Sequence, residues 1–319
     1  MSRTNPVRTA PHYVAEVDEG GLGAVDAVRV GDRTSNLWLD AWRDLRGRWM
    51  FWGSAVIIVF LIFVALFPTV FTAVPPNDQC YLSNSNGQPE PGHPLGYTLQ
   101  GCDVFARVVH GTSTSLSVGI IVTVMVAVMG ILIGAFAGYF GGWIDSLLMR
   151  VGDMFFAIPY ILAAVVIMSI FLDIRNIWII SLAIGFFAWP STARILRSEV
   201  LRVKQSDFVM ASEAIGLSRV RAMMTHVLPN SLAPVIIVST VGLAGAITAE
   251  ATLSFLGVGL PNNIYMSWGN DISAGQTSLR TNPWPLVYPS IALSITVLAF
   301  IMLGETVRDA LDPRARAIR

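Results

Sequence analysis

Few residues of this chain have the types and spacing that catalysis or nucleotide binding requires. A phosphate-binding loop of the form Gly-x4-Gly-Lys-Ser/Thr uses its lysine to reach the β- and γ-phosphates. Lys204 is the single lysine of the sequence, and Gln205 follows it, so the chain has no such loop. None of the four histidines shows a metal-binding spacing such as His-Glu-x-x-His. We therefore expect no catalytic residue, no bound cofactor and no metal site in this chain.

Glu250 is the one acidic residue that we place well inside an apolar run, over Thr248–Ser254. A charged carboxylate in a bilayer costs at least ~2.5 kcal/mol, so such a side chain is expected to face a cavity or a partner. In one interpretation, Glu250 is a polar residue on a translocation path or between subunits. In that case a structural contact that locks helices together is favoured over direct contact with the substrate. The alternative is that the span ends earlier and Glu250 lies near its outer end, paired or hydrated.

The segment Ser206–Asn230 has the pattern of two short amphipathic helices. A side-chain oxygen of Ser206 or Asp207 can cap the first helix. Its small-to-apolar stripe at i, i+3, i+4 and i+7 consists of Phe208, Ala211, Ser212 and Ile215.

Gly216 comes next, and it favours a left-handed residue that ends the first helix. Ser218 can cap the second helix, and Pro229 is expected to stop it because proline cannot continue the hydrogen-bond ladder. The second helix repeats the apolar spacing with Val220, Met223, Met224 and Val227. The two helices are typical of a docking surface, and the alternative is a helical hairpin on the membrane surface without a partner.

The composition is that of a membrane protein. Of 319 residues, 54% are hydrophobic and 13% are charged, against about 25% charged residues in soluble domains. The formal net charge is zero, which gives no reason to expect a nucleic-acid partner. Residues 1–34 are polar and contain no apolar run, so we expect a flexible cytoplasmic tail rather than a signal peptide.

Six apolar runs are long enough to cross a bilayer, for which a helix needs about 20 residues. The sequence therefore predicts an all-α integral membrane protein with six transmembrane helices. The expected spans are 50–70, Ser115–Phe136, Met154–Leu172, Ile177–Ala193, Leu232–Leu256 and Tyr288–Leu303. The expected regions are a tail (1–34), an interface segment with the first span (35–73), an external loop (74–112), a core domain (113–304) with a cytoplasmic loop (194–230), and a C-terminal tail (305–319).

The orientation follows from the positive charges near the ends of the spans, because cytoplasmic loops carry an excess of Lys and Arg. With the N-terminus inside, fourteen such residues lie on the cytoplasmic side. Only three lie outside: Arg107, Arg175 and Arg280. The sequence thus predicts cytoplasmic termini and a cytoplasmic loop at Ser206–Asn230.

This loop resembles the EAA loop of ATP-binding-cassette (ABC) importer permeases, whose pattern is Glu-Ala-Ala-x-x-x-Gly-x9-Ile-x-Leu-Pro. The matching stretch is Ala211-Ser212-x-x-x-Gly216, then nine residues, then His226-x-Leu228-Pro229. The chain departs from the pattern at Met210, Ser212 and His226. In that family the loop forms the coupling helix, which lies in a cleft of the cytoplasmic ATPase subunit.

Other stretches over about residues 35–319 are similar to the C-type permease subunit of dipeptide and oligopeptide ABC importers. They are His93-Pro94-Leu95-Gly96, Gly101-Cys102-Asp103-Val104, Glu250-Ala251-x-Leu253-Ser254-Phe255-Leu256-Gly257, Ser267-Trp268-Gly269 and Leu303-Gly304-Glu305-x-x-Arg308-Asp309-Ala310-Leu311-Asp312-Pro313-Arg314. The external signature departs from the family's at Tyr97, Thr98 and Cys102.

The resemblance implies a type I importer permease in the cell membrane. It implies a second homologous permease, two cytoplasmic ATPase subunits that bind ATP and Mg, and an extracytoplasmic peptide-binding protein. It assigns ATPase coupling to Phe208, Ala211, Ser212, Ile215, Gly216, Arg219, Arg221, Leu228 and Pro229. Nickel importers of the family share these signatures, so nickel or another small solute is the alternative to a peptide.

Cys80 and Cys102 are the only cysteines, and both fall in the first external loop. An oxidising compartment and a loop with little apolar sequence favour a disulfide between them. The alternative is two free thiols, with Cys102 merely replacing the arginine that is usual in the family.

Two other classes of protein fit the sequence less well. An ion-coupled secondary transporter predicts internal repeats, broken helices and several intramembrane carboxylates. The sequence shows no repeat and places only Glu250 within a span. A membrane-embedded enzyme would need a clustered catalytic set, and the sequence offers none.

Overall fold

The structure is a computed structural model, and it describes residues 37–311. These residues form thirteen α-helices joined by short 3-10 and π segments, and within them no β-strand occurs. The expectation of an all-α protein is confirmed. The expected tail at 1–34 lies outside the described residues, as do Arg314, Arg316 and Arg319.

The first helices lead to the loop that the sequence predicts to be external. Helix α1 covers Leu37–Leu45, α2 covers Trp49–Leu66 and α3 covers Pro68–Phe71. Proline at the start of α3 removes a helical hydrogen bond, so the expected first span divides at Phe67. The external loop that follows has one 3-10 turn, Leu82–Asn84.

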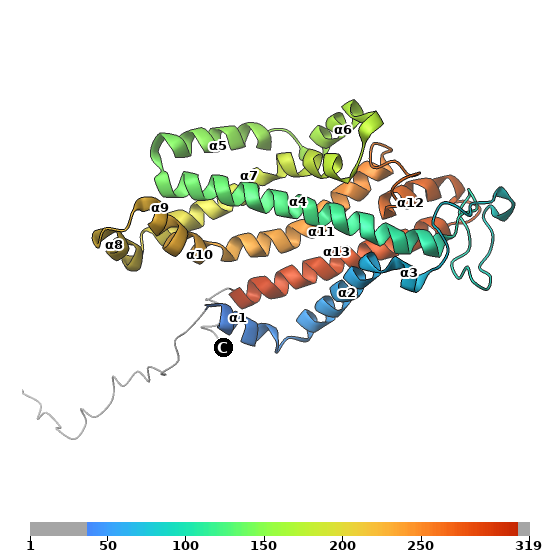
Figure 1. The fold of residues 1–319 in the computed structure, drawn as a ribbon, viewed down its shortest axis with the longest axis horizontal. Coiled ribbons are helices and arrows are strands. Elements are labelled where there is room, and N and C mark those ends of the chain that lie inside the picture. The colour runs from blue at the N-terminus through green and yellow to red at the C-terminus, as the bar shows by residue number, and fades with distance from the viewer. Residues whose placement is uncertain (1–36, 312–319) are drawn as a thin grey trace, which may run out of the picture. The chain divides into compact units, whose positions relative to one another are not determined.

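The longest helix is α4, Val104–Phe140, and it packs along α7, Ile177–Lys204 (Figure 1). Asp103 caps α4 by accepting from the N–H of Ala106 at 2.6 Å, and Asn176 caps α7 in the same way. Both helices extend beyond the spans expected from hydropathy. Hydropathy registers only the apolar part of a helix. Helix α7 continues as an amphipathic helix that buries Leu196 and Val200, whereas the start of α4 also buries Arg107.

Helices α5, Gly142–Phe156, and α6, Tyr160–Ile170, meet at a bend of 74°. The expected third span, Met154–Leu172, is therefore a broken one. Pro159 accounts for the break, because it cannot donate a helical hydrogen bond and it disfavours a helical conformation in the residue before it. A 3-10 turn, Leu172–Ile174, leads on to α7.

The C-terminal half contains two further long helices. Residues 207–231 form α8, Asp207–Ala214, α9, Arg219–Ala222, a π segment, Met223–Val227, and α10, Leu228–Ser231. Helix α11, Ala233–Phe255, follows, and α12, Trp268–Gly275, with the 3-10 turn Gln276–Ser278, connects it to α13, Trp284–Leu311.

Five helices of residues 37–311 are long and apolar enough to cross a membrane, namely α2, α4, α7, α11 and α13. The bent pair α5–α6 makes a sixth if it is one span, in agreement with the six expected. Figure 1 shows α8–α10 at one end of these helices and α12 with the external loop at the other.

Small residues allow α4 and α7 to approach closely. A Cβ atom at Gly134 of α4 would lie 2.5 Å from the carbonyl oxygen of Ala193, which is a severe clash. Such contacts are typical of membrane helices, whose association depends on close backbone packing. The helices bury separate apolar clusters along their length, one among α4, α6, α7 and α11 and another around the start of α11 and the ends of α4 and α7.

Candidate functional site

The loop Ser206–Asn230 forms the two helical segments that the sequence predicts. Helix α8 ends before Gly216, which adopts φ +94° as expected for a glycine that terminates a helix. A Cβ at Gly216 would meet nothing within 4 Å, so the backbone angle alone requires glycine here.

The expectation that Pro229 stops the second helix is wrong. The helix that begins at Arg219 widens into a π segment and then continues as α10 through Pro229 to Ser231. Proline is tolerated in the first turn of a helix, where its missing N–H needs no partner. The change of hydrogen-bond register at the π segment gives Pro229 that position at the start of α10.

The predicted apolar stripe divides between the inside and the outside of the molecule. Ser212 is buried together with its neighbour Val209. Phe208 is 49% exposed and Ile215 is 82% exposed. The second helix divides in the same way, with Met223 and Val227 buried and Val220 and Met224 exposed.

The remaining residues that the resemblance assigns to coupling lie at the surface of the same loop. Ala211, Arg219, Arg221 and Pro229 are exposed, and Leu228 is half-buried. Together with Phe208 and Ile215 they form what we call the coupling surface. Exposed apolar side chains and two arginines are thus brought together outside the ends of the long helices.

A polar contact that the sequence did not reveal joins this loop to α4. The hydroxyl of Tyr139, a residue that is 2% exposed, donates to Oε1 of Glu213 on α8 at 2.6 Å. The Nζ of Lys204 donates to the carbonyl oxygen of Tyr139 at 2.6 Å and lies 5.1 Å from its ring centroid. A tyrosine at a helix end gives no sequence signal of such a partner, because its contact lies 74 residues away.

Glu250 lies inside the fold of this chain, among α4, α11 and α12. Its residue exposure is 0%, and its carboxylate accepts from Ser115 on α4 at 3.1 Å and from Ser254 at 2.8 Å. Ser267, the residue that caps α12, also hydrogen-bonds to it. The carboxylate therefore links α4, α11 and the start of α12 by hydrogen bonds within this chain.

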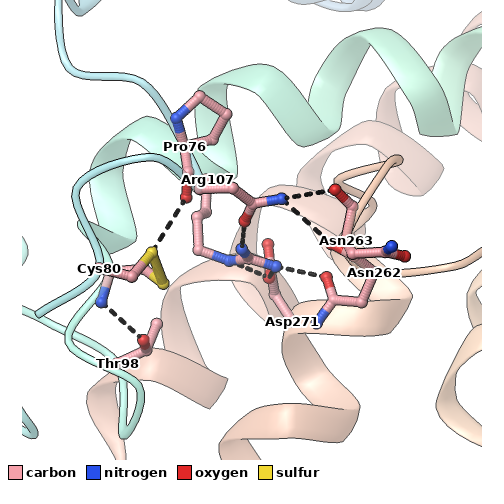
Figure 2. The surroundings of a disulfide bond; sticks show 9 residues. Pro76, Cys80, Thr98, Arg107, Asn262, Asn263 and Asp271 are labelled. Carbon is pink, nitrogen blue, oxygen red and sulfur yellow. Dashed lines mark hydrogen bonds and ion pairs between the residues drawn. A yellow bond between two sulfur atoms is a disulfide. The ribbon is translucent and has the colours of Figure 1, made fainter. Parts of the chain in front are cut away.

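Cys80 and Cys102 form a disulfide in the external loop, as expected (Figure 2). The disulfide lies beside a buried ion pair, in which Nε of Arg107 donates to Oδ1 of Asp271 at 2.6 Å. The other guanidinium nitrogens donate to the side-chain oxygens of Asn77 and Asn262, each at 2.5 Å. From the sequence, Arg107 counts only as an outer charge, and this network is not predictable because its members are distant in sequence.

The two halves of the external signature lie together. Val104 N–H donates to the Gly96 carbonyl at 3.1 Å, and His93 pairs with Asp103, the residue that caps α4. The hydroxyl of Tyr97 donates to Glu90 at 2.5 Å. Burial and this hydrogen bond raise the pKa of Tyr97 to about 12. We call residues 74–103, which these contacts fold back on the start of α4, the external cap.

Two cavities border these elements. One of about 490 Å³ lies between the external cap and α12, and Asn77, Arg107 and Asp271 line it. Another of about 200 Å³ lies among α4, α6, α7 and α11, and its walls are uncharged. Among residues 37–311 no three His, Cys, Asp or Glu side chains are placed to hold a metal ion.

Comparison with known proteins places this architecture in a family. Residues 130–317 match the family described as the binding-protein-dependent transport system inner membrane component. Residues 36–89 match the N-terminal transmembrane domain of oligopeptide transport permease C.

Individual relatives match nearly the whole chain. The oligopeptide transport system permease protein OppC of Bacillus subtilis (strain 168) is 31% identical over 94% of this chain and 97% of its own length. The dipeptide transport system permease protein DppC of Alkalihalophilus pseudofirmus is 33% identical over 88% of this chain and 91% of its own. The glutathione transport system permease protein GsiD of Escherichia coli O6:H1 is 32% identical over 93% and 97%.

The family match covers more than half of the chain, over the helices that carry the coupling loop and Glu250. This multi-pass membrane protein therefore belongs to the family of binding-protein-dependent transport system inner membrane components, as a permease subunit of an ABC importer.

Proposed function

We propose that this chain is one of two permease subunits of an ATP-driven importer of peptides. The relatives named above carry oligopeptides, dipeptides or glutathione according to their names, and all three classes consist of amino acids joined by amide bonds. The cavity among α4, α6, α7 and α11 fits this substrate class. Its walls are uncharged, so they do not favour peptides whose side chains carry one particular charge.

The observation that carries the proposal is the coupling surface. Phe208 and Ile215 leave apolar area uncovered beside Arg219 and Arg221, in a loop outside the long helices. Exposed apolar area rimmed by charge is typical of a protein interface. A cytoplasmic ATPase subunit is the partner that we assign to it, and that subunit would bind ATP and Mg.

The proposed cycle follows from this arrangement. Two ATPase subunits hold the coupling loops of this chain and of a second, homologous permease. Closure of the ATPases on ATP moves the two loops together and opens the path toward an extracytoplasmic peptide-binding protein, and hydrolysis resets it. Both termini and the coupling loop are cytoplasmic in this proposal, and the external cap is outside.

The test is transport by the complete complex. The permease pair, the ATPases and the binding protein are reconstituted in proteoliposomes, and uptake of labelled di-, tri- and pentapeptides is measured with and without ATP. We expect uptake that requires both ATP and the binding protein and that unlabelled peptide, but not Ni²⁺, suppresses. Uptake of Ni²⁺ in place of peptide would contradict the substrate, and uptake without ATP would contradict the transport class.

A further inference from the structure

The hydrogen bond between Tyr139 and Glu213 connects the coupling loop to the longest helix of the protein. Glu213 lies on α8, three residues before Gly216, and its side chain points back from the coupling surface to α4. The other partner, Tyr139, is the penultimate residue of α4 and is buried. The bond therefore joins α8 directly to one end of α4.

The apolar packing around this contact fixes which parts move together. Val209 of α8 is buried in a cluster with Tyr139 of α4 and with Leu196 and Val200 of α7. Met223 of the π segment belongs to the same cluster. An apolar cluster resists separation but allows sliding, whereas a hydrogen bond prescribes the distance between two atoms. The Tyr139–Glu213 bond is thus the contact that can fix the register of α8 on α4.

Lys204 holds the α4 end of this contact in place. The last carbonyl groups of a helix lack helical partners and carry partial negative charge, so a cation there is stabilising. Lys204 donates to one of these carbonyls, that of Tyr139, and it is the last residue of α7. The ends of α4 and α7 are therefore joined by a hydrogen bond at Tyr139, the residue that also binds Glu213.

We propose that Tyr139 and Glu213 are positioning residues, which transmit the movement of the coupling helix α8 to α4 during transport. This inference rests on the proposed function, because it presumes that an ATPase moves α8. Neither Tyr139 nor Glu213 belongs to the family signatures or to the coupling surface, so the inference names a further connection within the chain.

The experiment uses Tyr139→Phe in the complete reconstituted complex. The substitution removes one hydroxyl and keeps the ring that packs in the cluster and faces Lys204. ATPase subunits should still co-purify with the variant, because the coupling surface is intact. Because Glu213 is exposed, we expect the number of peptides transported per ATP hydrolysed to fall about threefold, a factor within the range of one ordinary hydrogen bond.

Variants of Glu213 separate positioning from simple stability. Glu213→Gln keeps an oxygen that accepts from Tyr139 and should retain most of the coupling, whereas Glu213→Leu should match Tyr139→Phe. The double variant, Tyr139→Phe with Glu213→Leu, should be no worse than either single variant, because both remove the same bond. Additive losses would overturn the proposal.

A matched control removes a tyrosine hydroxyl elsewhere. Tyr288 stacks on Trp284 near the start of α13, and Tyr288→Phe should transport as the wild type does. If Tyr139→Phe transported as many peptides per ATP as the wild type, the positioning role would be contradicted and the proposed function would be unaffected. Failure of the wild-type complex itself to transport any peptide would count against the proposed function.

Discussion

Gly216 shows how a single residue limits what the coupling loop tolerates. Its φ of +94° is a conformation that residues with a Cβ rarely adopt, although the space around it is open. We expect Gly216→Val to shift the end of α8, and so to lower both transport and co-purification of the ATPase subunits. The strain would be about 1–3 kcal/mol, and the permease pair should still insert and assemble.

Gly53 provides the matched control for this prediction. It lies in α2, where a Cβ would also meet nothing within 4 Å, but its backbone is helical. Gly53→Val should therefore leave transport and ATPase binding unchanged. Equal behaviour of the two variants would mean that Gly216 is only a tolerant surface turn.

Arg107 and Asp271 make up the most buried ion pair of the described residues, with side-chain exposures of 6% and 5%. Arg107→Met would leave the carboxylate of Asp271 buried without its cation. Loss of one partner from such a pair typically costs about 3–5 kcal/mol. We expect the detergent-purified variant to have a clearly lower melting temperature than the wild type. The melting temperature is measured by size-exclusion chromatography of samples heated to a series of temperatures.

The second variant of this pair is Arg107→Met with Asp271→Asn. It removes the unpaired charge, so it should recover part of the lost melting temperature. If the double variant melted below Arg107→Met, the charge would not be the cause.

At the residue scale, sequence reasoning succeeded where the requirement is local. The positive φ of Gly216 follows from its place after an amphipathic helix. The pairing of Cys80 with Cys102 follows from there being only two cysteines, both in one loop. Tyr139 and Asp271 were missed because their partners are distant in sequence, at Glu213 and Arg107.

The external cap is an element held by few apolar contacts of its own, and its disulfide should therefore contribute much of its order. Closing a loop over a sequence separation of 22 residues stabilises it by about 3 kcal/mol in the chain-entropy model. We expect replacement of both cysteines by serine to increase amide hydrogen exchange over residues 81–101, while α4 beyond its first turn stays protected.

Treatment of the wild-type protein with a reductant should give the same exchange pattern as the serine variant. A direct check is alkylation of the unfolded, unreduced protein. Modification of both cysteines there would show that the disulfide does not form in the natural protein.

The helices themselves were predictable in number and type, but their ends were not. Hydropathy detected the apolar centre of α4 and missed its first eleven residues, Val104–Thr114, because Arg107 and the polar run His110–Thr114 interrupt the apolar sequence there. It also stopped α7 at Ala193, although Leu196 and Val200 remain buried in the apolar cluster with Tyr139 and Val209. A helix ends where its backbone loses partners, and that point need not coincide with a change in polarity.

For the whole molecule, the distribution of Lys and Arg predicts which side of the membrane each end of the long helices faces. Because the disulfide occupies both native cysteines, one added cysteine would be the single free thiol. Ser218→Cys in the coupling loop and Ser83→Cys in the external cap are both exposed positions. In intact cells, an impermeant maleimide should label Ser83→Cys and not Ser218→Cys.

Permeabilised cells provide the control, because both variants should then be labelled to the same extent. Labelling of Ser218→Cys from outside the intact cell would reverse the orientation. The coupling surface would then be out of reach of a cytoplasmic ATPase.

The bend of 74° between α5 and α6 has a consequence for how this chain meets its surroundings. At the break, Pro159 has no N–H to donate to the carbonyl of Phe155, so the helical hydrogen-bond ladder is interrupted there. Hydrocarbon tails offer no donors, so irregular backbone at membrane depth persists only against protein or beside water. We therefore expect lipid to be kept away from this side of the molecule, where Met154 and Ile158 stand exposed in the single chain. We expect either that a second subunit covers the break or that a water-filled passage hydrates it.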